Sequence, residues 1–295
     1  MSVVLGVFEE GLIYAVMALG VYITYKILDF PDLSVDGTFP MGAAVTAALI
    51  LKGVHPVATL FLAFLTGALA GCVTGFIHVK LNVRDLLAGI IVMTGLYSIN
   101  LRIAGGKSNL PIFSKETIFE NAFLENHVPE ALAPYMAVII LFVIAAICKI
   151  VLDLYLNTRS GYLLRATGDN DVLVTSLAKD KGMVRIIGLA IANGFVALSG
   201  SIYCQHKGFF EISTGTGTMV MGLASVIIGT KLLKRFGAVK ATTAVILGTI
   251  VYKACVSLAI AMGMEASDLK LITSLLFLGI LAVSSNRGKK VKARA

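Results

Sequence analysis

Long apolar runs, each extensive enough to cross a lipid bilayer, occupy most of this 295-residue sequence. A membrane-spanning helix needs about 20 consecutive apolar residues, and the segment 55–79 is one of several that qualify. Hydrophobic residues make up 57% of the chain and charged residues only 14%, whereas about one-quarter of a soluble domain is charged. The sequence therefore predicts an all-α polytopic membrane protein.

Lys and Arg residues give the chain a net charge of +8, and most of them fall on one side of the predicted spans. This side includes Lys80, Arg84, the pair at 234–235 and the basic tail 285–295. Cytoplasmic loops carry an excess of Lys and Arg, so we expect this side and the C-terminus to be cytoplasmic. Because the charge follows the topology, it does not indicate nucleic acid as a partner.

Two short polar stretches interrupt the apolar sequence at 30–42 and 209–222, and each leads into a short apolar helix. Once one residue is gapped, the two stretches align, with Phe30 on Phe209. Breaks at corresponding positions of two halves of a membrane protein indicate a transport pathway. We call these segments the first and second broken stretches and expect them to line and gate that path.

A duplication accounts for further matches at nearly the same offset, and an odd number of predicted spans separates the two short helices. We therefore expect two inverted repeats with short or broken helices. About nine transmembrane helices are expected, over 11–28, 41–51, 55–79, 85–102, 133–155, 185–205, 219–232, 237–262 and 268–283. They form a single domain over 1–295, with repeat one (11–102), a linker span and inner loop (103–184), repeat two (185–284) and a basic cytoplasmic tail (285–295).

Small residues recur every fourth position in the third expected helix, at Gly67, Gly71 and Gly75. Such a face lets two helix backbones approach closely, so we expect a helix partner there. At the start of the next helix, the Asp85 carboxylate favours a helix N-terminus.

Carboxylates and hydroxyls in the broken stretches are the candidate pathway residues. Carboxylates in or near a membrane span are costly and are therefore functional candidates, although they could equally cap the short helices. The N-termini of those helices, together with the hydroxyls, could meet a carboxylate-bearing solute. The candidates are Asp32, Ser34, Asp36, Thr38, Glu211, Ser213, Thr214, Thr216 and Thr218.

The longest predicted inner loop, 156–184, carries two short helical segments. Gly161 is expected to break the chain, and Gly168 to stop an apolar turn that passes through Ala166. Asp169 or Asn170 then caps a second helix over 172–178, which Gly182 terminates. Two short helices on a basic loop predict a docking surface.

This loop resembles the cytoplasmic coupling loop of ABC importer permeases in the branched-chain amino acid and ribose group. The shared pattern is Gly, a few apolar residues, Ala-x-Gly-x-Asn, and a short helix that ends in Gly and an aliphatic residue. The matching residues are Gly161, Ala166, Gly168, Asn170, Gly182 and Met183. The resemblance continues in 67–75, 79–83 and 197–200, and covers most of the chain. It is greatest to a branch proposed to carry aromatic amino acids, although 31–37 is more acidic than the matching segment of branched-chain amino acid permeases.

The resemblance implies a permease subunit of an ATP-driven importer that moves a small solute, an amino acid and possibly an aromatic one, into the cytoplasm. It implies a bacterial plasma (inner) membrane location, two cytoplasmic ATPase subunits, an extracytoplasmic solute-binding lipoprotein and a second permease copy, either identical or closely related. No cofactor is expected on this chain, since ATP and Mg bind the ATPase. The implied ATPase-coupling residues are Gly161, Arg165, Ala166, Gly168, Asp169, Asn170, Ala178 and Gly182.

The sequence contains no residue spacing typical of a catalytic or metal-binding site that would argue against this interpretation. Gly106-Lys107-Ser108 resembles the end of a phosphate-binding loop, but position 101 is Leu where that motif needs Gly. The chain is therefore not expected to be an enzyme.

Two transport alternatives remain. An ion-coupled secondary transporter would use Asp32, Asp36 and Glu211 as ion ligands, and a channel would use 213–218 as its filter. Both leave the inner loop unexplained.

Overall fold

The computed structural model describes residues 2–121, 129, 132–169, 180–233 and 240–263, with 268, 271, 273–275 and 277–279. Seven helical segments in these residues are long and apolar enough to cross a membrane. The helices are α1 (Ser2–Val21), α2 (Val35–Leu51), α3 (Pro56–Lys80), α4 (Asp85–Ile103), α6 (Ala133–Leu156), α7 (Arg159–Asp169), α9 (Lys181–Lys207), α10 (Thr218–Ile227) and α11 (Ala241–Ala261). The π-helical turns η1 (Tyr22–Ile27) and η3 (Ile228–Leu233) continue α1 and α10, and η2 (Ile212–Gly215) is a short 3₁₀ turn.

The all-helical prediction is confirmed, and several helix ends lie where local signals place them. α3 begins after His55, whose Nδ1 accepts the N–H of Val57, and Pro56 occupies its first position. α4 begins at Asp85, as expected. The last expected helix, 268–283, lies largely outside the described residues.

The first short helix begins earlier than predicted, at Val35 instead of position 41, and Pro40 lies inside it. Pro40 has no N–H to offer the carbonyl of Asp36, four residues before it. Gly215 packs against that carbonyl and against the Pro40 ring, because a Cβ on Gly215 would overlap both. A contact from the second half of the chain therefore covers the break in hydrogen bonding.

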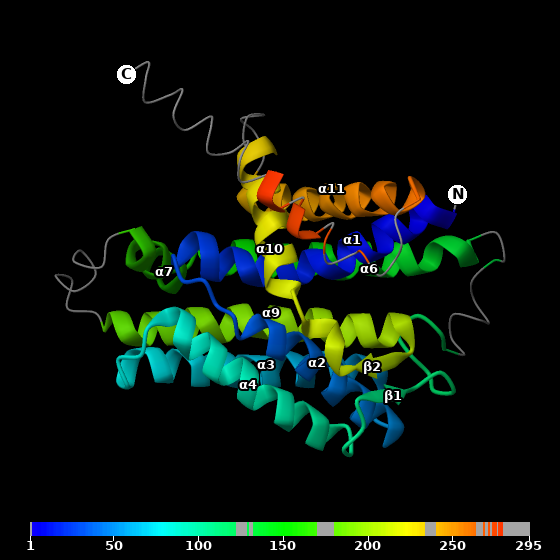
Figure 1. The fold of residues 1–295 in the computed structure, drawn as a ribbon, viewed down its shortest axis with the longest axis horizontal. Coiled ribbons are helices and arrows are strands. Elements are labelled where there is room, and N and C mark those ends of the chain that lie inside the picture. The colour runs from blue at the N-terminus through cyan, green and yellow to red at the C-terminus, as the bar shows by residue number, and fades with distance from the viewer. Residues whose placement is uncertain are drawn as a thin grey trace.

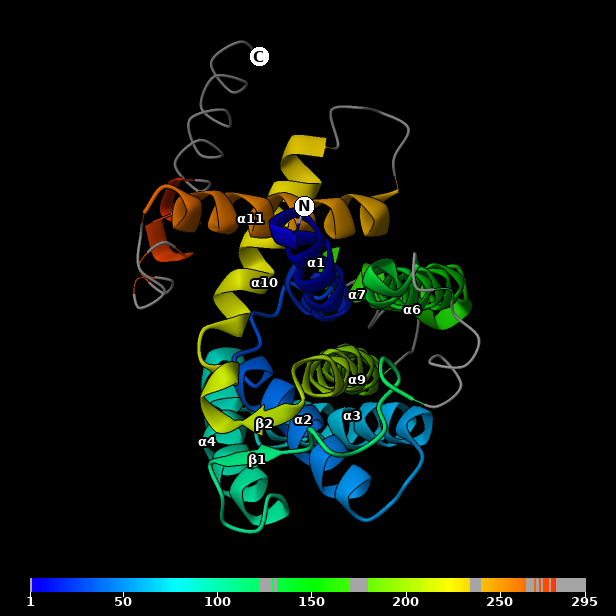
Figure 2. The ribbon, with the colours of Figure 1, turned by 90° about the vertical axis from the view of Figure 1, so that its right-hand side faces the viewer.

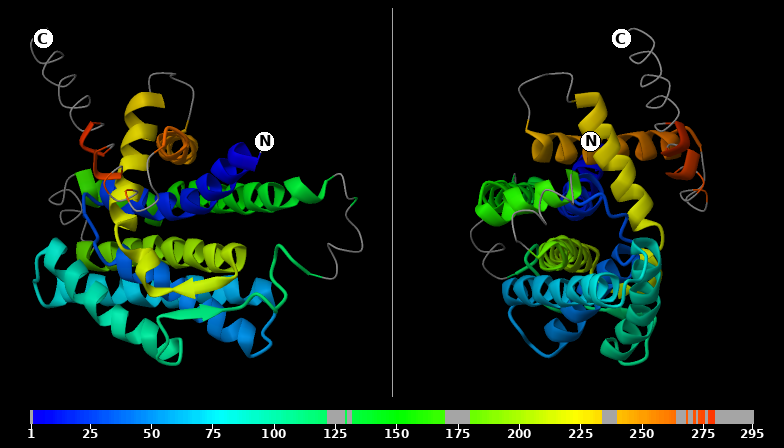
Figure 3. Two further views of the ribbon diagram at one scale, coloured as in Figure 1. Left: turned by 45° about the vertical axis from the view of Figure 1, so that its right-hand side comes forward. Right: turned by 90° about the vertical axis from the view of Figure 1, so that its left-hand side faces the viewer.

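α9 lies at the centre of the molecule, between α1 and α6 on one side and α2, α3 and α4 on the other (Figures 1 and 2). α1, α6 and α9 run along the long axis, whereas α10 crosses them at a steep angle and leads to α11 (Figure 3). The broken stretches come together beside α9 through contacts of α2 with η2 and α10.

The glycine face of α3 packs against α9, which confirms the predicted close contact. A Cβ at Gly67 or Gly71 would overlap the backbone carbonyl of Asn193 or Leu189, and Gly75 faces Ile186. α2 approaches α9 in the same way, since a Cβ at Gly42 would overlap the carbonyl of Ala197. These contacts hold α2, and with it the first broken stretch, on α9.

We expect Gly71→Leu to prevent α3 from docking on α9, because overpacking a tight contact costs about 1–3 kcal/mol and here the obstacle is backbone. The matched control is Gly95→Leu, since Gly95 is an exposed glycine in α4 with nothing near its Cβ position. The thermal unfolding midpoint of the purified protein should fall for Gly71→Leu only. Equal midpoints for the two variants would contradict the contact.

One feature that the sequence did not predict is a two-stranded antiparallel sheet of β1 (Asn109–Pro111) and β2 (Phe209–Glu211). Its register pairs Asn109 with Glu211, Leu110 with Phe210 and Pro111 with Phe209. Each strand has only three residues, too few for an alternating pattern. The pairing attaches the segment after α4 to the start of the second broken stretch.

Candidate functional site

The Asp36 carboxylate, in the first turn of α2, joins the two broken stretches. It accepts hydrogen bonds from the backbone N–H groups of Gly217 at 2.9 Å and Met219 at 2.7 Å, and from Oγ1 of Thr218 at 2.9 Å. The first N–H groups of a helix have no partner within the helix, so Asp36 caps α10 from another part of the chain. The left-handed conformation of Gly217, with φ at 86°, turns the chain into α10.

Asp32 is fully buried between the first broken stretch and α9. Its Oδ1 accepts the N–H of Ser34 at 2.9 Å, and its Oδ2 accepts Nδ2 of Asn193 at 2.7 Å. The hydroxyl of Ser34 in turn donates to Oδ1 of Asn193 at 3.2 Å. Burial raises the pKa of the Asp32 carboxyl above its ordinary value, and the hydrogen bonds from Ser34 and Asn193 oppose that rise.

Of the remaining pathway candidates, Thr38 belongs to the first broken stretch and the others belong to the second. Thr38 is buried and donates to the carbonyl of Ser34 within α2. Glu211 lies in β2, where its carboxylate accepts the hydroxyl of Ser213. A cavity of about 290 Å³ is lined by Thr214, Thr216, Gly217 and Thr218, and by residues of α11. Threonines of the second broken stretch therefore line a cavity, although the hydroxyls of Thr214 and Thr218 already donate to the carbonyl of Glu211 and to Asp36. Asp32, Ser34 and Thr38 are buried and hydrogen-bonded.

The inner loop differs from its sequence-based description. Gly161 does not break the chain, because α7 runs through it, and α7 is described as far as Asp169, one residue after Gly168. Gly182 does not end a helix but lies in the first turn of α9, where its N–H donates to Oδ1 of Asp180 at 2.8 Å. The predicted helix over 172–178 and the predicted coupling residues Asn170 and Ala178 lie outside the described residues.

Close packing explains the two glycines of α7. A Cβ at Gly161 would overlap the carbonyl oxygen of Tyr155, and a Cβ at Gly168 would overlap the carbonyl oxygen of Ile27, the last residue of η1. Arg165 and Asp169 are exposed on α7, and Ala166 is half-buried. α7 thus contacts the end of η1 directly, a few residues before the first broken stretch.

A second cavity, of about 680 Å³, lies where α7, η1 and η3 meet. Its lining includes Tyr22 and Lys26 of η1, Gly168 and Asp169 of α7, and Thr230 of η3. π-helical turns are frequent at functional sites, and two of them border this cavity. Neither turn was predicted from the sequence.

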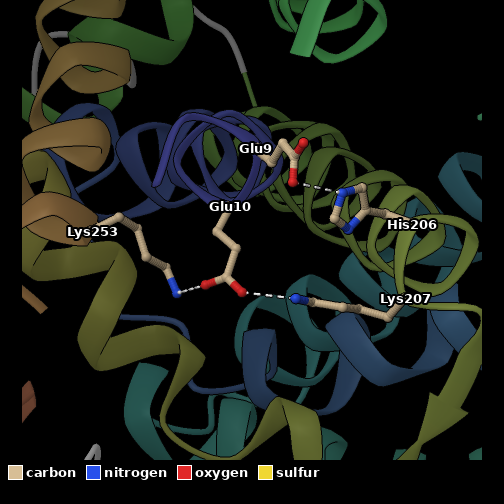
Figure 4. A network of polar contacts seen from close by, with 5 residues as sticks. All are labelled: Glu9, Glu10, His206, Lys207 and Lys253. Atoms are coloured by element: carbon tan, nitrogen blue, oxygen red, sulfur yellow. Dashed lines mark hydrogen bonds and ion pairs between the residues drawn. The ribbon is translucent and has the colours of Figure 1, made fainter. Parts of the chain in front are cut away.

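Reasoning from the sequence also missed a network of charged residues at one end of the bundle. His206 Nε2 lies 3.3 Å from Glu9, and Glu10 binds Lys207 at 2.8 Å and Lys253 at 3.1 Å (Figure 4). Asn193 was missed as well. An isolated Asn in the middle of an apolar run is a detectable signal, because a buried amide needs partners.

Comparison with known proteins places these features in a family. Residues 3–284 match the family described as the permease component of a branched-chain amino acid transport system. A tyrosine transport system permease protein of Clostridioides difficile is 45% identical, over 97% of this chain and 92% of the relative. An uncharacterised protein of Rickettsia prowazekii is 32% identical over 96% of this chain and 98% of its own length. An autoinducer 2 import system permease protein of Salmonella typhi is 29% identical, over 76% of this chain and 61% of the relative.

No solved structure matches the chain. The match over nearly the whole length confirms the resemblance found in the sequence and rejects the ion-coupled transporter and channel alternatives. With its candidate spans, the chain is a multi-pass membrane protein and a non-catalytic subunit. It belongs to the branched-chain amino acid transport system permease family, and is the permease component of an ABC importer.

Proposed function

We propose that this permease imports an aromatic amino acid, tyrosine first among them, along a path gated by the two broken stretches. The relative from Clostridioides difficile, described as a tyrosine transport permease, supports the solute. The contact between Asp36 and the N-terminus of α10 supports the gate, because it joins the two stretches by three hydrogen bonds. Separation of the stretches must break all three.

Force from the ATPase reaches this gate through α7. The exposed face of α7, with Arg165 and Asp169, docks on the ATPase, together with Asn170 and Ala178. Gly182 is buried against Val79 and supports the start of α9 instead. Movement of α7 is passed to η1 through the contact between Gly168 and the carbonyl of Ile27. The first broken stretch follows η1 directly, so α2 moves and Asp36 leaves α10.

The acids and hydroxyls have separate roles in this proposal. Asp32, Ser34 and Thr38 hold α2 in position, since all three are buried and hydrogen-bonded. Thr214, Thr216 and Thr218 line the cavity beside α10 through which the solute passes. Glu211, with Ser213, lies at the β1–β2 end of this path.

The assembly proposed has two permease copies around the path, two cytoplasmic ATPases that bind ATP and Mg, and a solute-binding lipoprotein on the outer side. Residues 11–102 and 185–284 form inverted repeats. The basic tail 285–295 and α7 lie on the cytoplasmic side of the bacterial inner membrane, as the Lys and Arg distribution favours. No cofactor is bound by this chain.

The test is uptake of labelled L-tyrosine into proteoliposomes that contain the permease, its ATPase and the binding protein. We expect accumulation that requires internal ATP and the binding protein, with L-phenylalanine as a competitor and L-leucine without effect. The control replaces ATP by a non-hydrolysable analogue. Uptake of L-leucine instead of L-tyrosine would contradict the proposed solute, and uptake without the ATPase would contradict the proposed ATP-driven mechanism.

A further inference from the structure

Lys253 is a cation in the middle of an apolar helix, α11. Long basic side chains near helix ends extend to the membrane surface, but Lys253 turns toward α1 and its side chain is only 12% exposed. Its ammonium lies 3.1 Å from Oε2 of Glu10 and 4.1 Å from the centre of the Tyr14 ring. Ionisable side chains within a membrane span are costly, and such residues generally mark a solute or ion pathway.

Glu10 has a second cationic partner. Its other carboxylate oxygen, Oε1, accepts from Lys207 at 2.8 Å, so one carboxylate lies between two ammonium groups (Figure 4). Lys207, at the end of α9, is more exposed than Lys253. Glu10 therefore keeps a counter-charge when Lys253 turns to another anion.

Lys253 lines two cavities. One, of about 390 Å³, lies between α1 and α11 and also exposes Glu10. The other is the cavity of about 290 Å³ lined by Thr214, Thr216 and Thr218 of the second broken stretch. The second volume is close to the lower end of the range for small-molecule sites, roughly 300–1,000 Å³. An ammonium in a cavity of this size is a suitable partner for a carboxylate, because hydrogen bonds between charged groups are about twice as strong as those between neutral groups.

The N-terminus of α10 is the competing candidate for that carboxylate, as expected from the sequence. It is already occupied, because the N–H groups of Gly217 and Met219 donate to Asp36. While the broken stretches are joined, a solute carboxylate in this cavity needs a different cation. Among the described residues that line this cavity, Lys253 is the one Lys or Arg side chain.

We propose that Lys253 binds the carboxylate of the solute in the cavity beside the second broken stretch, by exchange with Glu10, which stays paired with Lys207. The inference rests on the proposed function, since it requires a solute with a carboxylate. It makes Lys253 a residue that selects amino acids over their amides and amines.

The first test measures L-tyrosine uptake by the complete importer with Lys253→Met, Lys253→Arg or the matched control Lys149→Met. Lys149 likewise shares a carboxylate with a second lysine, since Asp153 lies 2.9 Å from Lys149 and 3.6 Å from Lys240, but it does not line the cavity with the threonines. Lys253→Met should reduce uptake about tenfold or more, the effect of one charge-assisted hydrogen bond. Lys253→Arg should recover part of the uptake, and Lys149→Met should stay within about twofold of wild type.

The second test separates solute binding from structure, and omits the binding protein. In nanodiscs, L-tyrosine should raise the unfolding midpoint of the wild-type and Lys149→Met complexes but not of Lys253→Met, and L-tyrosinamide should raise none. Where Lys253→Met does not insert, the double variant Glu10→Gln/Lys253→Met, which leaves no unpaired carboxylate, takes its place. Equal losses for the two lysine variants, or normal uptake with Lys253→Met, would overturn the inference alone. If the wild-type importer neither transports nor binds L-tyrosine, the proposed solute is wrong, and this inference is wrong with it.

Discussion

Asp36→Asn should reduce solute uptake at least about tenfold while ATP hydrolysis continues. The amide keeps one acceptor for Thr218 and Met219 but turns an N–H group toward the N–H of Gly217, where Oδ2 now accepts. A hydrogen bond to a charged group contributes about 1.5–3 kcal/mol, which corresponds to a factor of about 10 to 150 in the population of the joined state. The two broken stretches then separate without any movement of the ATPase, so ATP hydrolysis is uncoupled from import.

Uptake and ATPase activity of the same proteoliposomes measure this effect. Asp85→Asn is the matched control, because Asp85 also occupies the first turn of a helix but, within the described residues, accepts a local N–H, that of Leu86, at 2.9 Å. Its uptake should remain close to that of wild type. The gate would have to be placed elsewhere if Asp36→Asn imported solute normally with an unchanged ratio of ATP to solute.

The helices themselves follow from information that is local in the sequence. Apolar length defines α3, and the signals His55-Pro56 and Asp85 define where α3 and α4 begin. The glycine spacing of α3 correctly predicted a close helix contact, although it could not identify α9 as the partner. Local chemistry is sufficient here because a helix end satisfies its N–H groups with side chains only a few residues away.

Glycine and proline were misinterpreted where packing, and not backbone freedom, explains their presence. Gly161 was expected to interrupt the inner loop but lies within α7, and both Gly161 and Gly168 pack against backbone carbonyls. Pro40 was expected before the short helix and lies inside it, next to Gly215. The neighbour that decides each case is distant in the sequence, so no local pattern contains it.

The candidate site likewise has features that the sequence predicts and features that depend on residues distant in the sequence. The carboxylates and hydroxyls of the broken stretches were identified as residue types, and one of the two roles considered for the acids, helix capping, is what Asp36 does in the structure. The partners were not predictable, since Asp36 and Thr218 are 182 positions apart and each has several polar neighbours in its own stretch. Whether the same residues also line an open path stays a prediction.

Gly168→Leu is expected to abolish import, because the contact between α7 and η1 leaves no room for a side chain. Even a Cβ would overlap the carbonyl oxygen of Ile27, so the larger side chain must push α7 away from η1. Overpacking of this kind costs about 1–3 kcal/mol, and α7 is a short helix at the edge of the bundle that can move to avoid it. The exposed Arg165 and Asp169 remain available, so the ATPase should still co-purify while its hydrolysis no longer drives uptake.

Asp169→Arg distinguishes transmission from docking. Asp169 is exposed at the end of α7, so charge reversal there should leave α7 on η1 but weaken attachment of the ATPase. Gly168→Leu should therefore lose uptake with the ATPase bound, and Asp169→Arg should lose both together. Gly95→Leu, an exposed glycine in α4 with open space around it, controls for the added side chain and should import normally. Normal uptake with Gly168→Leu would show that force reaches the broken stretches by a route other than η1, since the contact with Ile27 cannot survive the substitution.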